Sequence, residues 1–152
     1  MARGGTTLRA FQRMKTITRS PEETEALAGD LAATLAAGDL VLLAGELGAG
    51  KTEFVKGLAK GLGIHGIIQS PTFALVREHR DGRVPLIHLD LYRLAGGGEV
   101  EELGLDELRA EGIVAVEWPE RAAASWTKPL VRVALAYGAV PDERLIEWQV
   151  ER

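Results

Sequence analysis

The octapeptide GELGAGKT at residues 45–52 constrains this chain more than any other feature of its sequence. It matches the pattern G-x-x-x-x-G-K-[ST], whose glycines allow a tight turn that brings several backbone N–H groups onto one anion. The apolar run LVLLA at 40–44 precedes it, and residues 51–62 read as a helix that ends at Gly63. A strand, a glycine-rich loop and a helix in this order predict a phosphate-binding site in an α/β fold.

The loop gives its polar groups distinct expected roles. Its backbone N–H groups and the positive dipole end of the following helix are expected to surround the phosphates of a nucleotide. Lys51 would contact the β- and γ-phosphates, and the hydroxyl of Thr52 would bind Mg²⁺. The predicted cofactors are therefore ATP and Mg²⁺. The predicted nucleotide-binding residues of the loop are Leu47, Gly48, Ala49, Gly50, Lys51 and Thr52.

Helical and extended patterns alternate along the rest of the chain. A helix is predicted to begin after Ser20, which is a suitable N-cap, with Pro21 at its first position. Leucines then recur at every fourth residue up to Leu35, and Gly38 is expected to end the helix. Residues 99–111 read as one helix or two short ones. Strands are predicted at 73–78, 86–91, 113–116, 131–136 and 145–150.

Turn signals decide how some of these strands pair. The dipeptides Asp81-Gly82 and Pro141-Asp142 separate neighbouring strands and predict hairpins. The interleaved helices favour parallel strands in the centre of the sheet. The predicted fold is a P-loop NTPase-like three-layer α/β sandwich, with a mixed, mainly parallel central sheet and antiparallel edge strands.

Two acidic residues end apolar runs and are candidates for the chemistry next to a bound metal. They are Asp90, after LIHL, and Glu117, after IVAV. Either carboxylate could orient Mg²⁺ while the other positions the attacking water, although each taken alone could also be a strand-end cap. His88 lies two residues before Asp90 and so shares its side of the strand, where a packing or hydrogen-bonding role is the commoner one.

Two further positions have open interpretations. Thr72, in Ser70-Pro71-Thr72, could sense a γ-phosphate as a switch threonine does, or could belong to a plain turn before a strand. Arg93 could contact phosphate or a partner, or could form a surface salt bridge.

Composition limits the class of protein. The formal net charge is −4 and 46% of residues are hydrophobic, which is typical of a globular domain and argues against a general nucleic-acid binder. No apolar run approaches the roughly 18 residues of a membrane span. The chain has no cysteine, and a cytoplasmic location fits these features. Residues 15–152 are expected to form one domain after an N-terminal extension at 1–14, either a poorly ordered tail or a functional arm.

With these segments placed, the chain resembles the TsaE family, also called YjeE, the small ATPases of the bacterial pathway that makes threonylcarbamoyladenosine in tRNA. Five blocks in chain order carry the resemblance. They are GELGAGKTEFVKGLAKGLG at 45–63, SPTFALV at 70–76, HLDLYRL at 88–94, ELGLDEL at 102–108 and VEWPER at 116–121.

The resemblance implies a partner-dependent ATPase. Members of the family hydrolyse ATP when assembled with TsaD and TsaB, which modify adenosine 37 of tRNAs reading ANN codons, so that tRNA is reached through the complex. Position by position, it implies that Lys51 binds phosphate and that Thr52 and Glu117 bind Mg²⁺. Asp90 lies at the nucleotide and positions water. It also implies a switch-like loop at Thr72, Trp118 and Glu120 near the nucleotide or partner surface, and an approach of residues 20–24 to the adenine.

Three other functions are compatible with a P-loop. A small-molecule kinase would need a second substrate pocket and an arginine-rich lid, and the arginines at 77, 80 and 83 instead flank a predicted hairpin. A GTP-dependent switch would carry an N-K-x-D motif, which the chain lacks. A nucleotide-bound scaffold without turnover would differ from a partner-dependent ATPase only when the partners are present.

Overall fold

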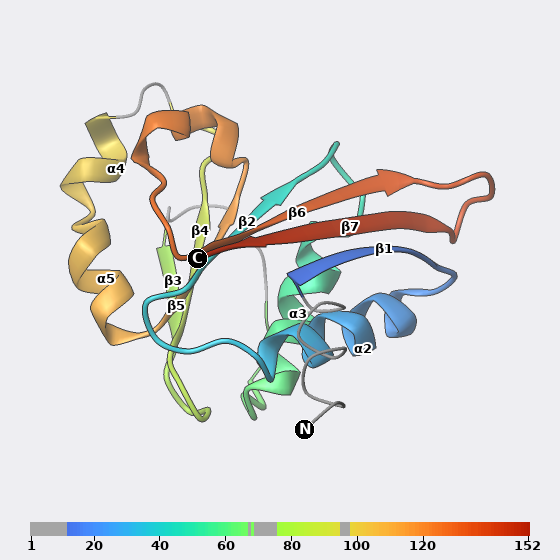
Figure 1. Cartoon of the computed structure of the whole chain (residues 1–152), viewed down its shortest axis with the longest axis horizontal. Helices are drawn as coiled ribbons and strands as arrows, with labels where there is room; N and C mark the ends of the chain where they lie inside the picture. The colour runs from blue at the N-terminus through green and yellow to red at the C-terminus, as the bar shows by residue number, and fades with distance from the viewer. Residues whose placement is uncertain (1–11, 67, 69–75, 95–97) are drawn as a thin grey trace.

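Seven strands form one sheet in the computed structural model, which describes residues 12–66, 68, 76–94 and 98–152 (Figure 1). Their order across the sheet is β1-β7-β6-β2-β5-β4-β3. The strands are β1 (Arg13–Thr18), β2 (Leu40–Ala44), β3 (Val76–His79), β4 (Leu86–Asp90), β5 (Ile113–Glu117), β6 (Leu130–Tyr137) and β7 (Arg144–Glu151).

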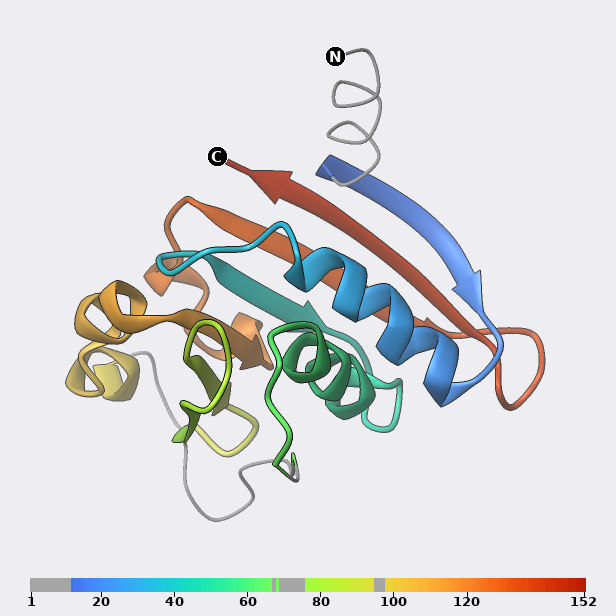
Figure 2. The ribbon, with the colours of Figure 1, turned by 90° about the horizontal axis from the view of Figure 1, so that it is seen from below.

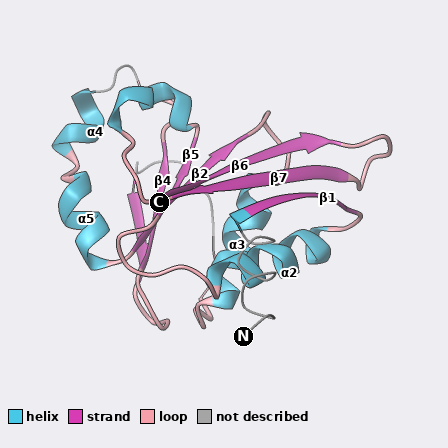
Figure 3. Cartoon of the chain, in the orientation of Figure 1, coloured by secondary structure: helices cyan, strands magenta, loops and turns pink. Residues whose placement is uncertain are grey.

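The centre of the sheet is parallel and its edges are antiparallel. Figure 3 shows the strands with the helices around them. Strand β2 pairs in parallel with both β5 and β6, and β5 pairs in parallel with β4. Hairpins add β3 to β4 at one edge and β7 to β6 at the other, where β1 completes the sheet. The parallel strands place their carboxyl ends at one edge of the sheet, where ligands of open α/β sheets bind. The predicted fold class is confirmed.

Helices cover the sheet on both faces and make it the middle of three layers. Helices α2 (Pro21–Ala32) and α3 (Lys51–Gly61) pack on one face against alternate strand residues such as Val41 and Leu43. Helices α4 (Gly98–Glu102) and α5 (Leu105–Glu111) and the 3₁₀ helix η1 (Pro119–Ser125) lie on the other, against residues such as Leu42. The strict alternation within β2 follows from the two-residue period of a strand.

Close packing of α2 against α3 fixes the helix that follows the phosphate loop. Figure 2 shows the two helices side by side across the sheet. Gly57 of α3 lies against the backbone of Glu25, where a Cβ atom would collide with the carbonyl oxygen. The two backbones therefore approach closely, and the start of α3 is held rigidly over the ends of the parallel strands.

Most predicted elements are found, with shifted ends. The Ser20 side chain caps α2 by accepting from the Glu23 N–H at 3.1 Å, but the helix ends at Ala32, before Gly38. A short turn at 33–35 keeps Leu35 buried and lets the chain cross to β2. Gly104, with φ of 71°, separates α4 from α5, so the 99–111 region forms two helices. Residues 73–75 of the predicted strand lie outside the described residues.

Two elements were not predicted, namely β1 and η1. Strand β1 begins at Arg13, so Arg13 and Met14 belong to the sheet and not to the extension expected over 1–14, of which residues 1–11 lie outside the described residues. Among the described residues, no helix combines the length and apolar character needed to cross a membrane.

Candidate functional site

The phosphate loop leaves β2 and enters α3 through backbone conformations that need glycine. Gly50 has φ of 107° and immediately precedes α3. The Phe54 N–H in the first turn of this helix donates to the Gly50 carbonyl at 2.9 Å. Gly45 passes so close to β6 that a Cβ atom would lie 2.5 Å from the Leu135 oxygen. The two glycines therefore allow the loop to turn tightly between the strand and the helix, as the motif predicted.

The β6–β7 hairpin holds this loop from outside. The Tyr137 hydroxyl donates to the Leu47 carbonyl at 2.6 Å, and Nη2 of Arg144 donates to the Gly48 carbonyl at 3.4 Å. The Arg144 guanidinium also lies 4.8 Å from the centroid of the Tyr137 ring. The sequence analysis missed both residues, because they lie about ninety positions from the loop and belong to no recognisable motif.

Lys51 is almost fully buried, with 4% of its surface exposed. Its Nζ donates to the Gly45 carbonyl and lies 3.4 Å from the centroid of the Trp118 ring. Burial lowers the pKa of Lys51 below its ordinary value, and the carboxylates of Glu117, Glu120 and Asp90 oppose this shift. The cation thus sits in a buried site beside three acids that the sequence analysis singled out.

Two of those acids come together through strand register. Asp90 at the end of β4 lies opposite Glu117 at the end of β5 in the parallel ladder. Oδ1 of Asp90 accepts a hydrogen bond from the Tyr92 N–H at 3.0 Å. Glu117 is buried, and its Oε2 lies 2.6 Å from Nε2 of His88, which has no exposed surface. Alternation along β4 and β5 directs all three side chains to the face covered by α3.

Trp118 follows Glu117 and has an unusual backbone. Its φ of 59° makes it the one non-glycine residue with positive φ in the described part of the chain. Its ring packs on Tyr92 at a centroid distance of 5.0 Å as well as beneath Lys51. Left-handed backbone at a bulky residue costs free energy and is concentrated at functional sites. The VEWPER block at 116–121 therefore places Trp118, an aromatic residue with a constrained backbone, next to Lys51.

The other predicted positions have mixed outcomes. Thr52 begins α3 next to Lys51 and is half-buried, while Glu120 is exposed in η1 and acts on Lys51 through its charge. Arg93 is exposed. Thr72 lies outside the described residues. In the 20–24 segment, Ser20 caps α2 and Thr24 hydrogen-bonds Thr18 at 2.7 Å, so both have structural partners.

The donor set suits Mg²⁺ bound together with a nucleotide. Among the described residues, no cluster of three or more His, Asp or Glu side chains could hold a metal by itself. Mg²⁺ in nucleotide sites takes one or two protein ligands and completes its shell with phosphate oxygens and water. The hydroxyl of Thr52 and the carboxylates of Glu117 and Asp90 are hard oxygen donors of this kind.

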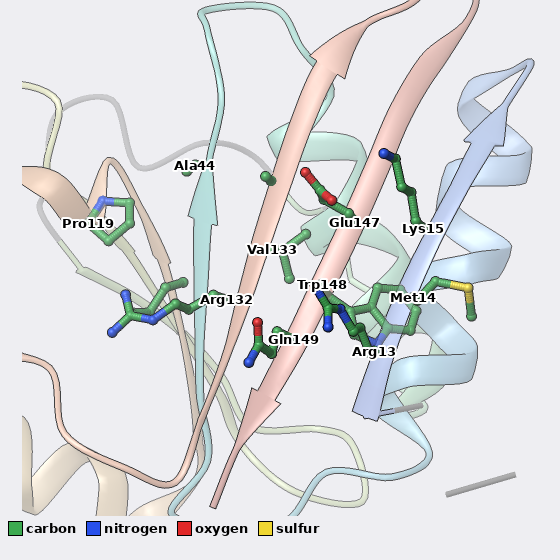
Figure 4. A pocket seen from close by; sticks show the side chains of 12 residues that line it. Arg13, Met14, Lys15, Ala44, Pro119, Arg132, Val133, Glu147, Trp148 and Gln149 are labelled. Carbon is green, nitrogen blue, oxygen red and sulfur yellow. The ribbon is translucent and has the colours of Figure 1, made fainter. Parts of the chain in front are cut away.

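A separate hollow of about 480 Å³ lies on the open face of β6, β7 and β1 (Figure 4). Its lining includes Arg13, Lys15, Arg132 and Glu147, and Pro119 closes one side. No residue of the 45–52 loop lines it. The hollow is therefore distinct from the site at the carboxyl ends of the strands.

Known proteins share both the sequence and the fold. Residues 18–146 match the family model described as threonylcarbamoyl adenosine biosynthesis protein TsaE. The tRNA threonylcarbamoyladenosine biosynthesis protein TsaE of Bacillus subtilis is 49% identical over 109 residues, which are 71% of this chain and 68% of the relative. The protein of the same name from Streptomyces coelicolor is 46% identical over 119 residues, 74% of this chain and 80% of the relative.

A solved structure agrees with this assignment. The crystal structure of YdiB from Bacillus subtilis superposes with a TM-score of 0.77 at 38% identity, covering 91% of this chain and 85% of that one. The family match includes both the phosphate loop and the strand-end acids. The chain belongs to the TsaE family of threonylcarbamoyladenosine biosynthesis proteins.

Proposed function

We propose that this chain is a Mg²⁺-dependent ATPase that supports the t6A37 modification of tRNAs reading ANN codons, hydrolysing ATP in complex with TsaB and TsaD. The observation that carries the proposal is the convergence of Lys51, Asp90 and Glu117 at the carboxyl edge of the parallel strands, directly beneath the start of α3. A phosphate-binding loop alone would support nucleotide binding, whereas such a loop beside two carboxylates also supports nucleotide hydrolysis.

Binding would exchange the partners of Lys51. Its ammonium group is engaged by the Gly45 carbonyl and the Trp118 ring, and a β- or γ-phosphate is a stronger partner because it is charged. The loop from Leu47 to Gly50 would supply backbone N–H groups at the positive end of α3. A bound phosphate would therefore compete with the Gly45 carbonyl and the Trp118 ring for Lys51.

The acids would act once the nucleotide is in place. Mg²⁺ would neutralise developing charge on the phosphates, held by Thr52 and Glu117. Asp90 would accept a hydrogen bond from the attacking water and orient it towards the γ-phosphate. Thr72 is proposed as a switch residue that senses the γ-phosphate, and Glu120 as a residue near the nucleotide.

Dependence on partners is consistent with the surface around the loop. Leu47 is 71% exposed at the tip of the loop, where a partner protein could reach it. With a net charge of −4, contact with tRNA is proposed to occur through the complex, in the cytoplasm.

The decisive experiment is ATP hydrolysis measured by phosphate release, with the chain alone and with the TsaB–TsaD pair of the same organism. Stimulation by the pair, abolished in a Lys51→Ala variant, supports the proposal. Lys56→Ala is a matched control on the same helix, since Lys56 pairs only with Glu53 among the described residues. Transfer of the γ-phosphate to a metabolite would instead identify a small-molecule kinase.

A further inference from the structure

We propose that His88 is a positioning residue for Glu117, and that its Nε2–H holds the carboxylate in the orientation used at the Mg²⁺–nucleotide site. The inference rests on the proposed function, because the orientation of Glu117 matters to the reaction only if the loop binds a metal–nucleotide. His88 itself lies behind the site and contacts neither phosphate nor metal in this proposal.

The contact is short and excluded from water. His88 on β4 lies opposite Ala115 on β5, two residues before Glu117, so the imidazole reaches along the ladder to the carboxylate. Nε2 lies 2.6 Å from Oε2, with His88 at 0% and Glu117 at 4% exposure. A hydrogen bond to an ionised group is stronger than a neutral one, and the burial of both residues limits competition from water. The bond therefore fixes the Glu117 side chain.

The geometry also assigns the proton on the ring. An ionised carboxylate only accepts hydrogen bonds, so Nε2 must donate. Nδ1 is buried and has no hydrogen-bond partner among the described residues, and an N–H there would be left unpaired. The arrangement favours the neutral Nε2–H tautomer, in which His88 gives its single donor to Glu117.

His88 competes with Lys51 for the same carboxylate. Of the acids around Lys51, Glu117 has the largest effect on its pKa. Without a donor from His88, the buried Glu117 carboxylate would be free to turn towards Lys51 and away from the position at which it would bind Mg²⁺. His88 binds Oε2, whereas Oε1 accepts no hydrogen bond from a described residue. The histidine thus keeps anion and cation apart.

The test is the Mg²⁺ dependence of nucleotide binding, measured with a fluorescent ATP analogue in His88→Leu and His88→Gln. Outer-shell partners of a metal ligand typically contribute roughly 10- to 100-fold to metal affinity. We expect a loss of that size in the Mg²⁺ affinity of the His88→Leu complex, with nucleotide binding in the absence of Mg²⁺ little changed. His88→Gln keeps a donor close to the position of Nε2 and should restore most of the Mg²⁺ affinity.

A matched control separates positioning from general stability. Arg109 is also buried and hydrogen-bonded, to the carbonyls of Gly38 and Pro129, which precede β2 and β6 at the opposite edge of the sheet. Arg109→Met should lower the melting temperature and leave the Mg²⁺ affinity unchanged. Equal Mg²⁺ affinity in His88→Leu and the unmodified chain would overturn the positioning role.

The tautomer of His88 can be measured on the unmodified chain, so this test does not depend on whether the His88→Leu variant folds. Long-range ¹H–¹⁵N correlation of labelled histidines should show the Nε2–H tautomer for His88, assigned by the loss of its signals in His88→Gln. The Nδ1–H tautomer, with no proton on Nε2, would overturn the proposal. If the unmodified chain shows no Mg²⁺-dependent nucleotide binding, the proposed function fails and the inference fails with it. Mg²⁺-dependent binding that is unaffected in His88→Leu would overturn the inference and leave the proposed function unchanged.

Discussion

The ammonium nitrogen of Lys51 lies 3.4 Å from the centre of the Trp118 indole ring, in a site that leaves the lysine 4% exposed. The cation is therefore stabilised by a ring face and by the Gly45 carbonyl. Trp118 reaches this position with φ of 59°, a conformation that costs about 1–3 kcal/mol and persists only where the surrounding structure maintains it. A phosphate bound by Lys51 would compete with both partners for the ammonium group.

Removing the ring should therefore favour the nucleotide. In Trp118→Leu, Lys51 loses a cation–π partner that would compete with a bound phosphate. Since such contacts contribute about 0.5–1 kcal/mol or more, we expect nucleotide affinity to rise about two- to fivefold. Isothermal titration with ATP checks this, and Trp118→Phe, which keeps a weaker ring partner, should give a smaller gain. Weaker binding in Trp118→Leu would show that the indole contacts the nucleotide itself.

Burial of Lys51 should also make stability depend on pH. Burial lowers the pKa of Lys51 below its ordinary value of 10.5, so the unfolded chain binds this proton more tightly than the folded chain does. Charged Lys51 therefore destabilises the fold at neutral pH, and this cost falls as pH rises from the lowered value towards 10.5. Lys51→Met should melt at a higher temperature than the unmodified chain at pH 7. The difference should shrink in alkaline buffer, and a constant difference across this range would contradict the assignment.

Asp90→Asn should separate binding from hydrolysis. The asparagine keeps an Oδ1 acceptor for the Tyr92 N–H and replaces the charged carboxylate by a neutral amide of nearly the same shape, so the fold should be retained. We expect ATP to bind with similar affinity, and partner-stimulated turnover to fall by roughly 10²- to 10⁴-fold, the range typical of a lost general base. Phosphate release with the TsaB–TsaD pair is the measurement. Normal turnover would make Asp90 a structural residue and remove it from water positioning.

The hydroxyl of Tyr137 should contribute to nucleotide affinity without touching the nucleotide. Tyr137→Phe removes its bond to the Leu47 carbonyl but keeps the ring beside Arg144. Because one hydrogen bond contributes about 1 kcal/mol, a looser loop should bind ATP up to about fivefold more weakly, with a small change in melting temperature. Unchanged affinity would show that the glycine-rich loop keeps its shape without the hairpin.

Local patterns predicted the elements that local interactions determine. The cap at Ser20, the buried strand at 40–44 and the glycine-rich turn depend on residues within a few positions of one another, and all three are found. The same holds for the acids at 90 and 117, because each directly ends an apolar run. Strand β1 was missed because its alternation of basic and apolar residues is short and becomes meaningful only beside β7.

The sequence by itself determined that the chain has a phosphate loop, two strand-end carboxylates and the fold class that brings them to one edge of a sheet. Only the tertiary structure decided how their side chains are partnered: Lys51 against Trp118, Glu117 against His88, and the loop against Tyr137. The physical reason is register. The paired strands bring side chains and loops together from positions 29 to 90 residues apart, and no local pattern encodes which of them will share a hydrogen bond.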